Sequence, residues 1–262
     1  MSSSPPSLLP AAVSVLELSH LQARESCKAR RNRTSATTTL THGGWCLSPP
    51  IVDHKAGQRH SGGIVNLPSN HTFALPQGHY RADGGVVRVL VRLLEGGQSL
   101  NDFGAGVGEY GHELKAVNES IAWHGYDGAG NIEEYTSGFV RFFDLTIPLS
   151  LPRADWVLSL EVGEHISQQF EAQYIRNLDA HNCRGIIGSW APPKQAGTGH
   201  INRRNKTYVL ERFVELGYRV DEQLQTALVT ARSHHGGFDW PLIRKNIFAV
   251  VRDRPSCVAE LS

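Results

Sequence analysis

Apolar residues recur at helical spacing just beyond residue 82, and short apolar runs alternate with amphipathic stretches from there onward. The first helical run is ended by Gly96 and Gly97, and its apolar positions are Val86, Val87, Leu90, Val91 and Leu94. Asp83 precedes this run, where an acidic residue favours the start of a helix. Strands that alternate with helices predict a doubly wound, mostly parallel α/β sheet with helices on both faces.

The short apolar runs place seven strands on the chain. We predict strands over residues 99–103, 121–126, 139–143, 154–160, 184–190, 218–221 and 246–252. Further helices are predicted over residues 110–120, 167–179, 206–216 and 222–232, and Gly217 follows the third of them as a stop signal. Together these elements predict one domain over residues 79–254, followed by a short tail over 255–262.

The N-terminal third lacks this periodicity. Residues 1–40 contain many Ser, Thr and basic residues and are predicted to be a disordered tail or an organelle-targeting peptide. Residues 41–78 are rich in Gly, Pro, His and Ser and are predicted to form an irregular lead-in. Trp45 within it is expected to dock onto the domain, either as a simple hydrophobic anchor or as part of a lid.

Length and charge restrict the class of protein. The 262 residues can hold one large domain with an extension, and a formal net charge of +1 gives no electrostatic case for nucleic acid or a membrane surface. No stretch reaches the roughly 18 apolar residues of a membrane span. Four scattered cysteines without a CxxC pair indicate neither zinc nor a dithiol motif. We therefore expect reduced thiols in the cytoplasm, or in an organelle if the N-terminus is a targeting peptide.

A glycine-rich turn follows the first predicted strand and precedes a helix. It contains Gly104, Gly106 and Gly108, with Asp102 just before them. Glycines at a strand-to-helix turn let the backbone approach a ligand closely, and this is where nucleotide-like cofactors bind in doubly wound folds. A carboxylate at Asp102 would repel a pyrophosphate and attract a cationic amino-acid group, which favours S-adenosylmethionine over a dinucleotide.

From this turn onward the chain resembles the class I S-adenosylmethionine-dependent methyltransferases, over about residues 79–252. The first motif of that family reads acidic-x-Gly-x-Gly-x-Gly and matches Asp102, Gly104, Gly106 and Gly108. The resemblance implies that the glycine turn wraps the methionine part of the cofactor and that Asp102 lies near its amino group. It also implies a seven-stranded sheet whose last strand inserts antiparallel.

Acids at the next two strand ends fit the same resemblance. Asp127 lies 25 residues after Asp102 and, with Gly128, is predicted to bind the ribose, because a carboxylate can accept both hydroxyls. The resemblance places Asp144 at the adenine amino group and the backbone amide of Leu145 at a ring nitrogen. Both acids could instead be turn or cap residues.

Three candidate residues follow the fourth predicted strand, and the resemblance implies that they lie near the reacting groups. Glu161 is expected beside the cofactor's sulfonium, and Glu164 and His165 toward the methyl acceptor. A neutral imidazole at His165 is a candidate general base, although methyl transfer from a sulfonium also proceeds by alignment alone. The alternative is that Glu164 and His165 only shape the loop.

A polar loop after the fifth predicted strand is the candidate acceptor site, since ligands collect at the carboxyl edge of such sheets. Its candidate residues are Trp190, His200, Asn202 and Arg203. A solvated connector is the alternative. The acceptor is expected to be a small molecule, and neither its identity nor the oligomeric state follows from the sequence.

Two rival functions remain open. Gly106, Gly108 and Gly111 also satisfy the GxGxxG pattern of NAD(P)-dependent oxidoreductases. A non-catalytic protein that keeps the fold is the second rival. A nucleic-acid methyltransferase is disfavoured by the balanced charge. Adjacent His234 and His235 point in different directions from one backbone, and we assign no metal site to the chain.

Overall fold

The structure is a computed structural model that describes residues 14–31, 46–47, 63–66, 72–76, 81–233, 238–254 and 257. Trp45, His234 and His235, and with them the predicted anchor or lid, lie outside these residues. Among the described residues, no helix combines the length and the apolar composition that crossing a membrane requires.

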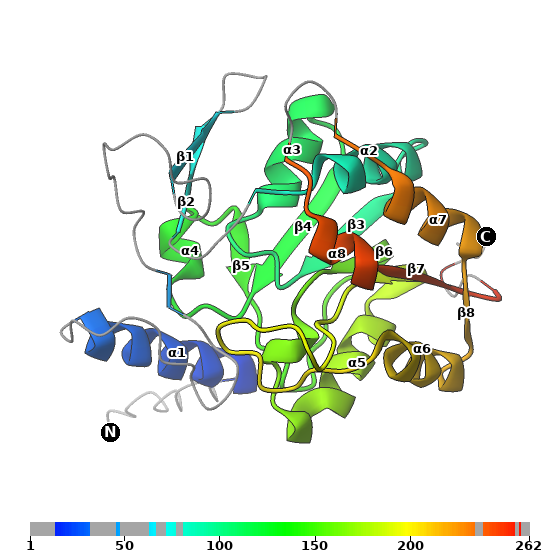
Figure 1. The fold of residues 1–262 in the computed structure, drawn as a ribbon. Coiled ribbons are helices and arrows are strands. Elements are labelled where there is room, and N and C mark those ends of the chain that lie inside the picture. Colours follow the sequence, from blue (N-terminus) through cyan, green and yellow to red (C-terminus); the bar gives the residue numbers. More distant parts are fainter. Residues whose placement is uncertain are drawn as a thin grey trace, which may run out of the picture.

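A seven-stranded sheet forms the centre of the fold (Figure 1). In spatial order its strands are β5 (Val140–Phe142), β4 (Ala122–Asp127), β3 (Ser99–Phe103), β6 (Ala154–Ser159), β7 (Asn182–Gly188), β9 (Phe248–Arg252) and β8 (Tyr218–Val220). The pairs from β5 to β7 are parallel, and β9 runs antiparallel between β7 and β8. The predicted fold class is therefore confirmed, including the antiparallel last strand.

Helices cover both faces of the sheet, as the apolar strands require. Successive residues of a strand face opposite sides of the sheet. Val157 of β6 and Ile186 of β7 therefore belong to one core, and their neighbours Leu158 and Ile187 belong to the other. The first core is shared with α5 (Glu171–Ala180) and α6 (Lys206–Glu215). The second is shared with α2 (Gly84–Leu93), α3 (Glu109–Val117), α4 (Ile132–Tyr135), α7 (Glu222–Thr230) and α8 (Pro241–Asn246) (Figure 1). The short helices α4 and α8 were not predicted from the sequence.

Asp83 has the role at the start of α2 that its position predicts. Its side chain accepts a hydrogen bond of 3.0 Å from the backbone N–H of Val86. It also forms a buried ion pair with Arg244 of α8, with a shortest N–O distance of 2.8 Å. One carboxylate therefore both caps α2 and joins it to α8.

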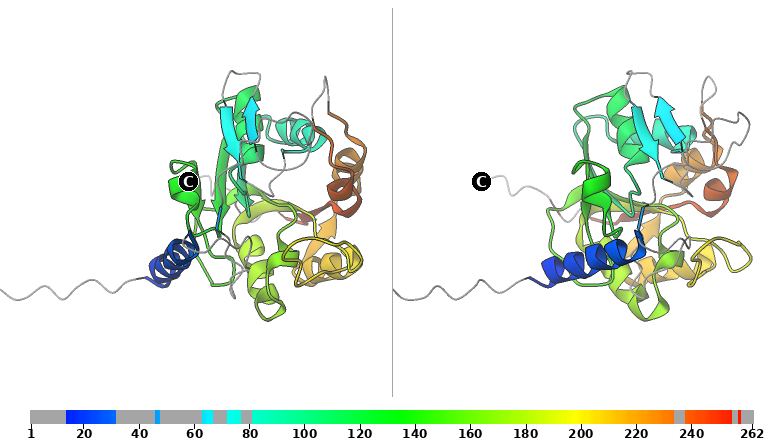
Figure 2. Two further views of the ribbon diagram at one scale, coloured as in Figure 1. Left: turned by 60° about the vertical axis from the view of Figure 1, so that its left-hand side comes forward. Right: turned by 90° about the vertical axis from the view of Figure 1, so that its left-hand side faces the viewer.

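The N-terminal region is more ordered than the sequence predicted. Residues 15–31 form the helix α1 (Val15–Arg31), so the prediction of a disordered tail is wrong there. Figure 2 shows α1 running across the outside of the domain, where the ring of His20 stacks on Phe142 of β5 at 4.2 Å. The predicted irregular lead-in contains an antiparallel pair, β1 (Gly63–Asn66) and β2 (Thr72–Leu75).

Two disulfides replace the reduced thiols that we expected. Cys27 of α1 bonds to Cys46, and Cys183 of β7 bonds to Cys257. The cytoplasmic prediction rested on reduced cysteines, and disulfides are rare in the reducing cytosol, so that prediction loses its main support.

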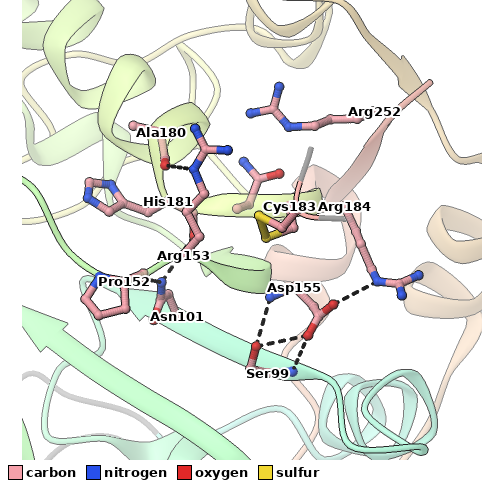
Figure 3. Close-up of a disulfide and its surroundings, with 12 residues drawn as sticks. Ser99, Asn101, Pro152, Arg153, Asp155, Ala180, His181, Cys183, Arg184 and Arg252 are labelled. Atoms are coloured by element: carbon pink, nitrogen blue, oxygen red, sulfur yellow. Dashed lines mark hydrogen bonds and ion pairs between the residues drawn. A yellow bond between two sulfur atoms is a disulfide. The ribbon is translucent and has the colours of Figure 1, made fainter. Parts of the chain in front are cut away.

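The second disulfide lies at the amino ends of the parallel strands. In Figure 3, Cys183 stands near Ser99 of β3 and near Asp155 and Arg184, which belong to β6 and β7. Asp155 accepts hydrogen bonds from Ser99 and from Arg184 there. The carboxyl ends, where the predicted site residues follow their strands, form the opposite edge of the sheet.

Candidate functional site

The glycine turn connects β3 to α3 and requires glycine at its positive φ angles. Gly104, Gly106 and Gly108 have φ values of 77°, 57° and 86°, in the left-handed region that other residues avoid. A Cβ on Gly104 would also come within 2.3 Å of Val162 Cγ2. The turn therefore lies directly against the segment that follows β6.

Asp127, at the end of β4, is tied to this turn. Its Oδ2 accepts a hydrogen bond of 3.0 Å from the N–H of Gly106, and its Oδ1 accepts one of 2.8 Å from Ala129. A Cβ on Gly128 would meet only a carbonyl oxygen at 3.7 Å, so the chain leaves room beside the carboxylate. Two backbone amides thus fix the orientation of the predicted ribose ligand.

Asp102 lies beneath the turn instead of facing a ligand. It is 3% exposed, and its Oδ2 accepts a hydrogen bond from the indole N–H of Trp123. Burial raises the pKa of Asp102 to about 8, with smaller effects from Glu109 and Asp127. A neutral carboxyl group neither repels a pyrophosphate nor attracts an ammonium group strongly, so our charge argument for the cofactor does not hold in this state.

Asp144 follows β5 and is held by its own turn and by α1. Its Oδ1 accepts hydrogen bonds from the backbone and the hydroxyl of Thr146, and its Oδ2 accepts one of 2.6 Å from Ser19. Leu145 is buried, and its carbonyl accepts a hydrogen bond from Asn177. Helix α1 therefore reaches the end of β5, where the adenine was predicted.

Glu161 follows β6 with a strained backbone. Its φ of 55° is unusual for a residue other than glycine, and such outliers cluster at functional sites. Its carboxylate accepts hydrogen bonds from Ser189 and from Gln195, at 2.8 and 3.0 Å. The sequence analysis missed both partners, although Ser189 lies at the end of a strand that it predicted.

Glu164 and His165 form a short 3₁₀ turn (Gly163–His165) after β6. The Glu164 side chain is fully buried, and neither of its carboxylate oxygens accepts a hydrogen bond. Burial, and then the nearby carboxylate of Glu161, raise the pKa of Glu164 well above its ordinary range. His165 Nδ1 lies 3.1 Å from the carbonyl oxygen of Gly199.

A loop from the far side of the site brings His200 to Glu164. The backbone amides of Ile201 and Asn202 both donate to the carbonyl oxygen of Glu164, at 2.9 Å. His200 Nε2 then lies 3.9 Å from Glu164 Oε1, and the His165 and His200 rings meet edge to face at 5.0 Å. One ligand atom from each of Glu164, His165 and His200 lies within 4.8 Å of the others.

The other predicted acceptor residues have structural roles. Trp190 is buried and donates from its indole N–H to the carbonyl oxygen of Asn202 at 2.6 Å. Asn202 is also buried and donates to the Glu171 carboxylate at 2.8 Å. Arg203 contacts the carbonyl oxygen of Gln195 at 3.3 Å. Of the four predicted residues, only His200 therefore reaches Glu164 and His165 with its side chain.

No protein-family description and no curated protein matches the chain. Solved structures match at low identity. A magnesium protoporphyrin IX methyltransferase from Synechocystis, with bound SAH, shares 18% identity over 63% of this chain and 81% of that chain, with a TM-score of 0.45. The CcbJ methyltransferase from Streptomyces caelestis shares 10% identity over 66% of this chain and 90% of that chain, with a TM-score of 0.46. These matches concern the doubly wound fold, which the strand order already establishes.

Proposed function

We propose that this chain is an S-adenosylmethionine-dependent methyltransferase acting on a small-molecule acceptor. The antiparallel insertion of β9 between β7 and β8 carries the proposal. The dinucleotide-binding relatives of this architecture have a six-stranded sheet in the order 3-2-1-4-5-6, whereas the seven-stranded sheet with one reversed strand is what the resemblance to methyltransferases implies.

Gly111, the last glycine of the dinucleotide pattern, has a packing role in this fold. A Cβ on Gly111 would lie 2.6 Å from the ring of Trp123, so this residue is explained by packing of α3 against β4. The Trp123 indole in turn holds Asp102 at 3.1 Å. The third glycine of the dinucleotide pattern has the same packing role, so Gly111 does not separate the two cofactor classes and the strand order alone carries the choice.

Four groups of residues would hold the cofactor in this proposal. The backbone turn around Gly106 would take the methionine part, Asp127 the ribose, Asp144 and Leu145 the adenine edge, and Glu161 the side of the reacting methyl group. The fit is clearest at Asp127, which Gly106 and Ala129 orient toward the turn, whereas Asp144 already accepts hydrogen bonds from Thr146 and Ser19.

The chemistry needs little from the protein beyond alignment. A bound S-adenosylmethionine would supply an electrophilic methyl group for transfer to the acceptor's lone pair, with the sulfur as leaving group. In the proposal, His165 takes the acceptor's proton. A proton on its Nδ1 donates to Gly199 O, which leaves the lone pair on Nε2.

Calorimetric titration of the purified chain with S-adenosylmethionine, S-adenosylhomocysteine and NAD tests the proposal. We expect micromolar binding of the first two and none of NAD. Binding of NAD alone would contradict the proposal. Binding of both sulfur compounds without methyl transfer to any acceptor in a labelled-methyl screen would favour the non-catalytic alternative.

A further inference from the structure

Glu164 is a buried carboxyl group whose neighbours are the Glu161 carboxyl, the Ala191 backbone and His200, at 3.9 Å. The Glu164 side chain has no exposed surface, and both of its oxygens lack hydrogen-bond partners. The Nδ1 atom of His200 is also buried and lacks a partner. Buried polar groups are nearly always hydrogen-bonded in folded proteins, so a cluster of unpaired ones points to a ligand.

His165 is oriented as a metal-ligating histidine is. Such residues donate one ring N–H to a carbonyl or carboxylate, which fixes the ring and exposes the other nitrogen's lone pair. The contact of 3.1 Å between His165 Nδ1 and Gly199 O has this form, because a carbonyl oxygen only accepts. The same loop that supplies this carbonyl also supplies His200.

The loop is built to keep His200 in place. A Cβ on Gly197 would lie 2.1 Å from His200 Nε2, so the ring packs directly against this glycine. Ile201 and Asn202 anchor the next turn to the carbonyl of Glu164. Backbone contacts at Gly199 and at residues 201–202 thus bring His165 and His200 together beside Glu164.

We propose that Glu164, His165 and His200 bind one divalent first-row transition metal ion. Two imidazoles and one carboxylate suit Zn²⁺ or Mn²⁺ better than Mg²⁺ or Ca²⁺, which prefer oxygen ligands alone. The ligand atoms lie within 4.8 Å of one another, close enough for one ion to reach all three after small side-chain movements. The nearby carboxylate of Glu161 adds negative charge that such an ion would offset.

The ion's position gives it a role in the proposed methyl transfer, and only this role depends on that proposal. Val162, two residues before Glu164, packs against Gly104 of the glycine turn. An acceptor oxygen or nitrogen coordinated by the metal would have a lowered pKa and a fixed direction of attack. His165 then acts as a ligand, and solvent takes the proton in its place.

Metal binding is measured on the full chain after chelator treatment, by calorimetry with Zn²⁺, Mn²⁺, Co²⁺, Mg²⁺ and Ca²⁺. We expect one equivalent of Zn²⁺ or Mn²⁺ to bind. We also expect it to displace bound Co²⁺, whose visible absorption reports imidazole ligands and is then lost. Mutation of a residue that only supports a metal ligand weakens metal affinity about 10–100-fold. Because Glu164 and His200 are ligands themselves, E164Q and H200N should each weaken metal affinity by at least about 100-fold.

Controls separate the metal site from the cofactor site. The substitution H124N changes an exposed histidine on β4 and should leave metal affinity unchanged. Circular dichroism and thermal unfolding check that E164Q and H200N are folded, and titration with S-adenosylhomocysteine is run on each protein. Wild-type protein that binds no transition ion, or E164Q that binds it normally, overturns the inference even if S-adenosylhomocysteine binds. Metal binding without any S-adenosylhomocysteine binding sustains the metal site and refutes the proposed function.

Discussion

Asp102 gives the protein a pH dependence that belongs to a single residue. Burial raises the pKa of this carboxyl from 3.8 to about 8. Between these values the unfolded chain has lost the proton that the folded chain keeps, so stability falls as the pH rises through this range. Asp102→Asn stays neutral and can still accept from Trp123. At pH 8 we expect it to exceed the wild type in free energy of unfolding by more than about 1 kcal/mol, since each pKa unit corresponds to about 1.4 kcal/mol.

Urea denaturation at pH 5 and pH 8 measures this effect as the difference between variant and wild type, which should grow toward pH 8. Asp155→Asn is the control. Its hydrogen bonds with Ser99 and Arg184 lower the pKa of Asp155, so its carboxylate is ionised in both states at both pH values. The effect of Asp155→Asn on stability should therefore be the same at pH 5 and pH 8. If the stability difference between Asp102→Asn and wild type is also the same at pH 5 and pH 8, Asp102 is ionised in the folded protein.

Asp127 is the residue through which the cofactor assignment is tested most directly. Hydrogen bonds to a charged group contribute about 1.5–3 kcal/mol, so Asp127→Ala should weaken S-adenosylhomocysteine binding about 10–100-fold. Asp127→Asn retains an acceptor for Gly106 and should lose less affinity. Calorimetry measures both variants, with the exposed Asp253 changed to Asn as the control. Wild-type affinity in Asp127→Ala would remove the carboxylate from the ribose site.

The seven strands of the sheet were predictable because each is a short apolar run bounded by turn residues. The first was predicted with its observed bounds, 99–103, and the others within a few residues. Helix α1 was missed because its inward face mixes apolar residues, such as Leu16 and Cys27, with polar ones. That face presents Ser19, His20 and Ala23 at helical spacing, while Val15 and Leu18 are 67% and 51% exposed. Only tertiary contacts with β5 and the α4 region identify this face, and a single sequence does not contain them.

Those contacts make α1 an element whose attachment can be measured. Ser19 donates to Asp144 at 2.6 Å, and removing one hydrogen bond costs about 1 kcal/mol. In Ser19→Ala we therefore expect the amides of α1 to exchange with deuterium about fivefold faster, with β3 and β6 unchanged. Glu25→Ala, at an exposed position of the same helix, is the matched control for altered helix propensity. Equal exchange in Ser19→Ala and wild type would mean that Asp144 does not hold α1.

At the scale of the whole molecule, the site joins segments that a sequence shows as separate. The turn at 104–108 and the acids after later strands were predictable, because carboxyl ends of parallel strands meet at one edge. The contact of His200 with Glu164 was not predictable, because it depends on two backbone hydrogen bonds between Glu164 and residues 37 and 38 positions further along the chain. Cysteine pairing was unpredictable for the same reason: Cys183 and Cys257 are 74 residues apart in the sequence.

This long-range disulfide should contribute to the stability of the whole domain. Closing a loop of 74 residues restricts the unfolded chain by about 4 kcal/mol in the chain-entropy account, whereas the 19-residue separation of Cys27 and Cys46 corresponds to about 3 kcal/mol. We expect Cys257→Ser to lower the free energy of unfolding by about 2–4 kcal/mol under oxidising conditions.

Reducing conditions provide the decisive comparison for this variant. Both proteins then lack both disulfides, so their urea denaturation curves should coincide, because Cys257 itself is exposed and a serine there changes no core contact. A gap that persists in reductant would assign the effect to the side chain at residue 257. If the curves coincide without reductant as well, the bond does not stabilise the folded chain in solution.

Since β7 is paired with both β6 and β9, a disulfide that anchors the start of β7 restrains the sheet where its parallel and antiparallel parts meet. For that reason we expect its loss to lower the unfolding midpoint of the whole sheet in one cooperative transition, not to fray the C-terminus alone.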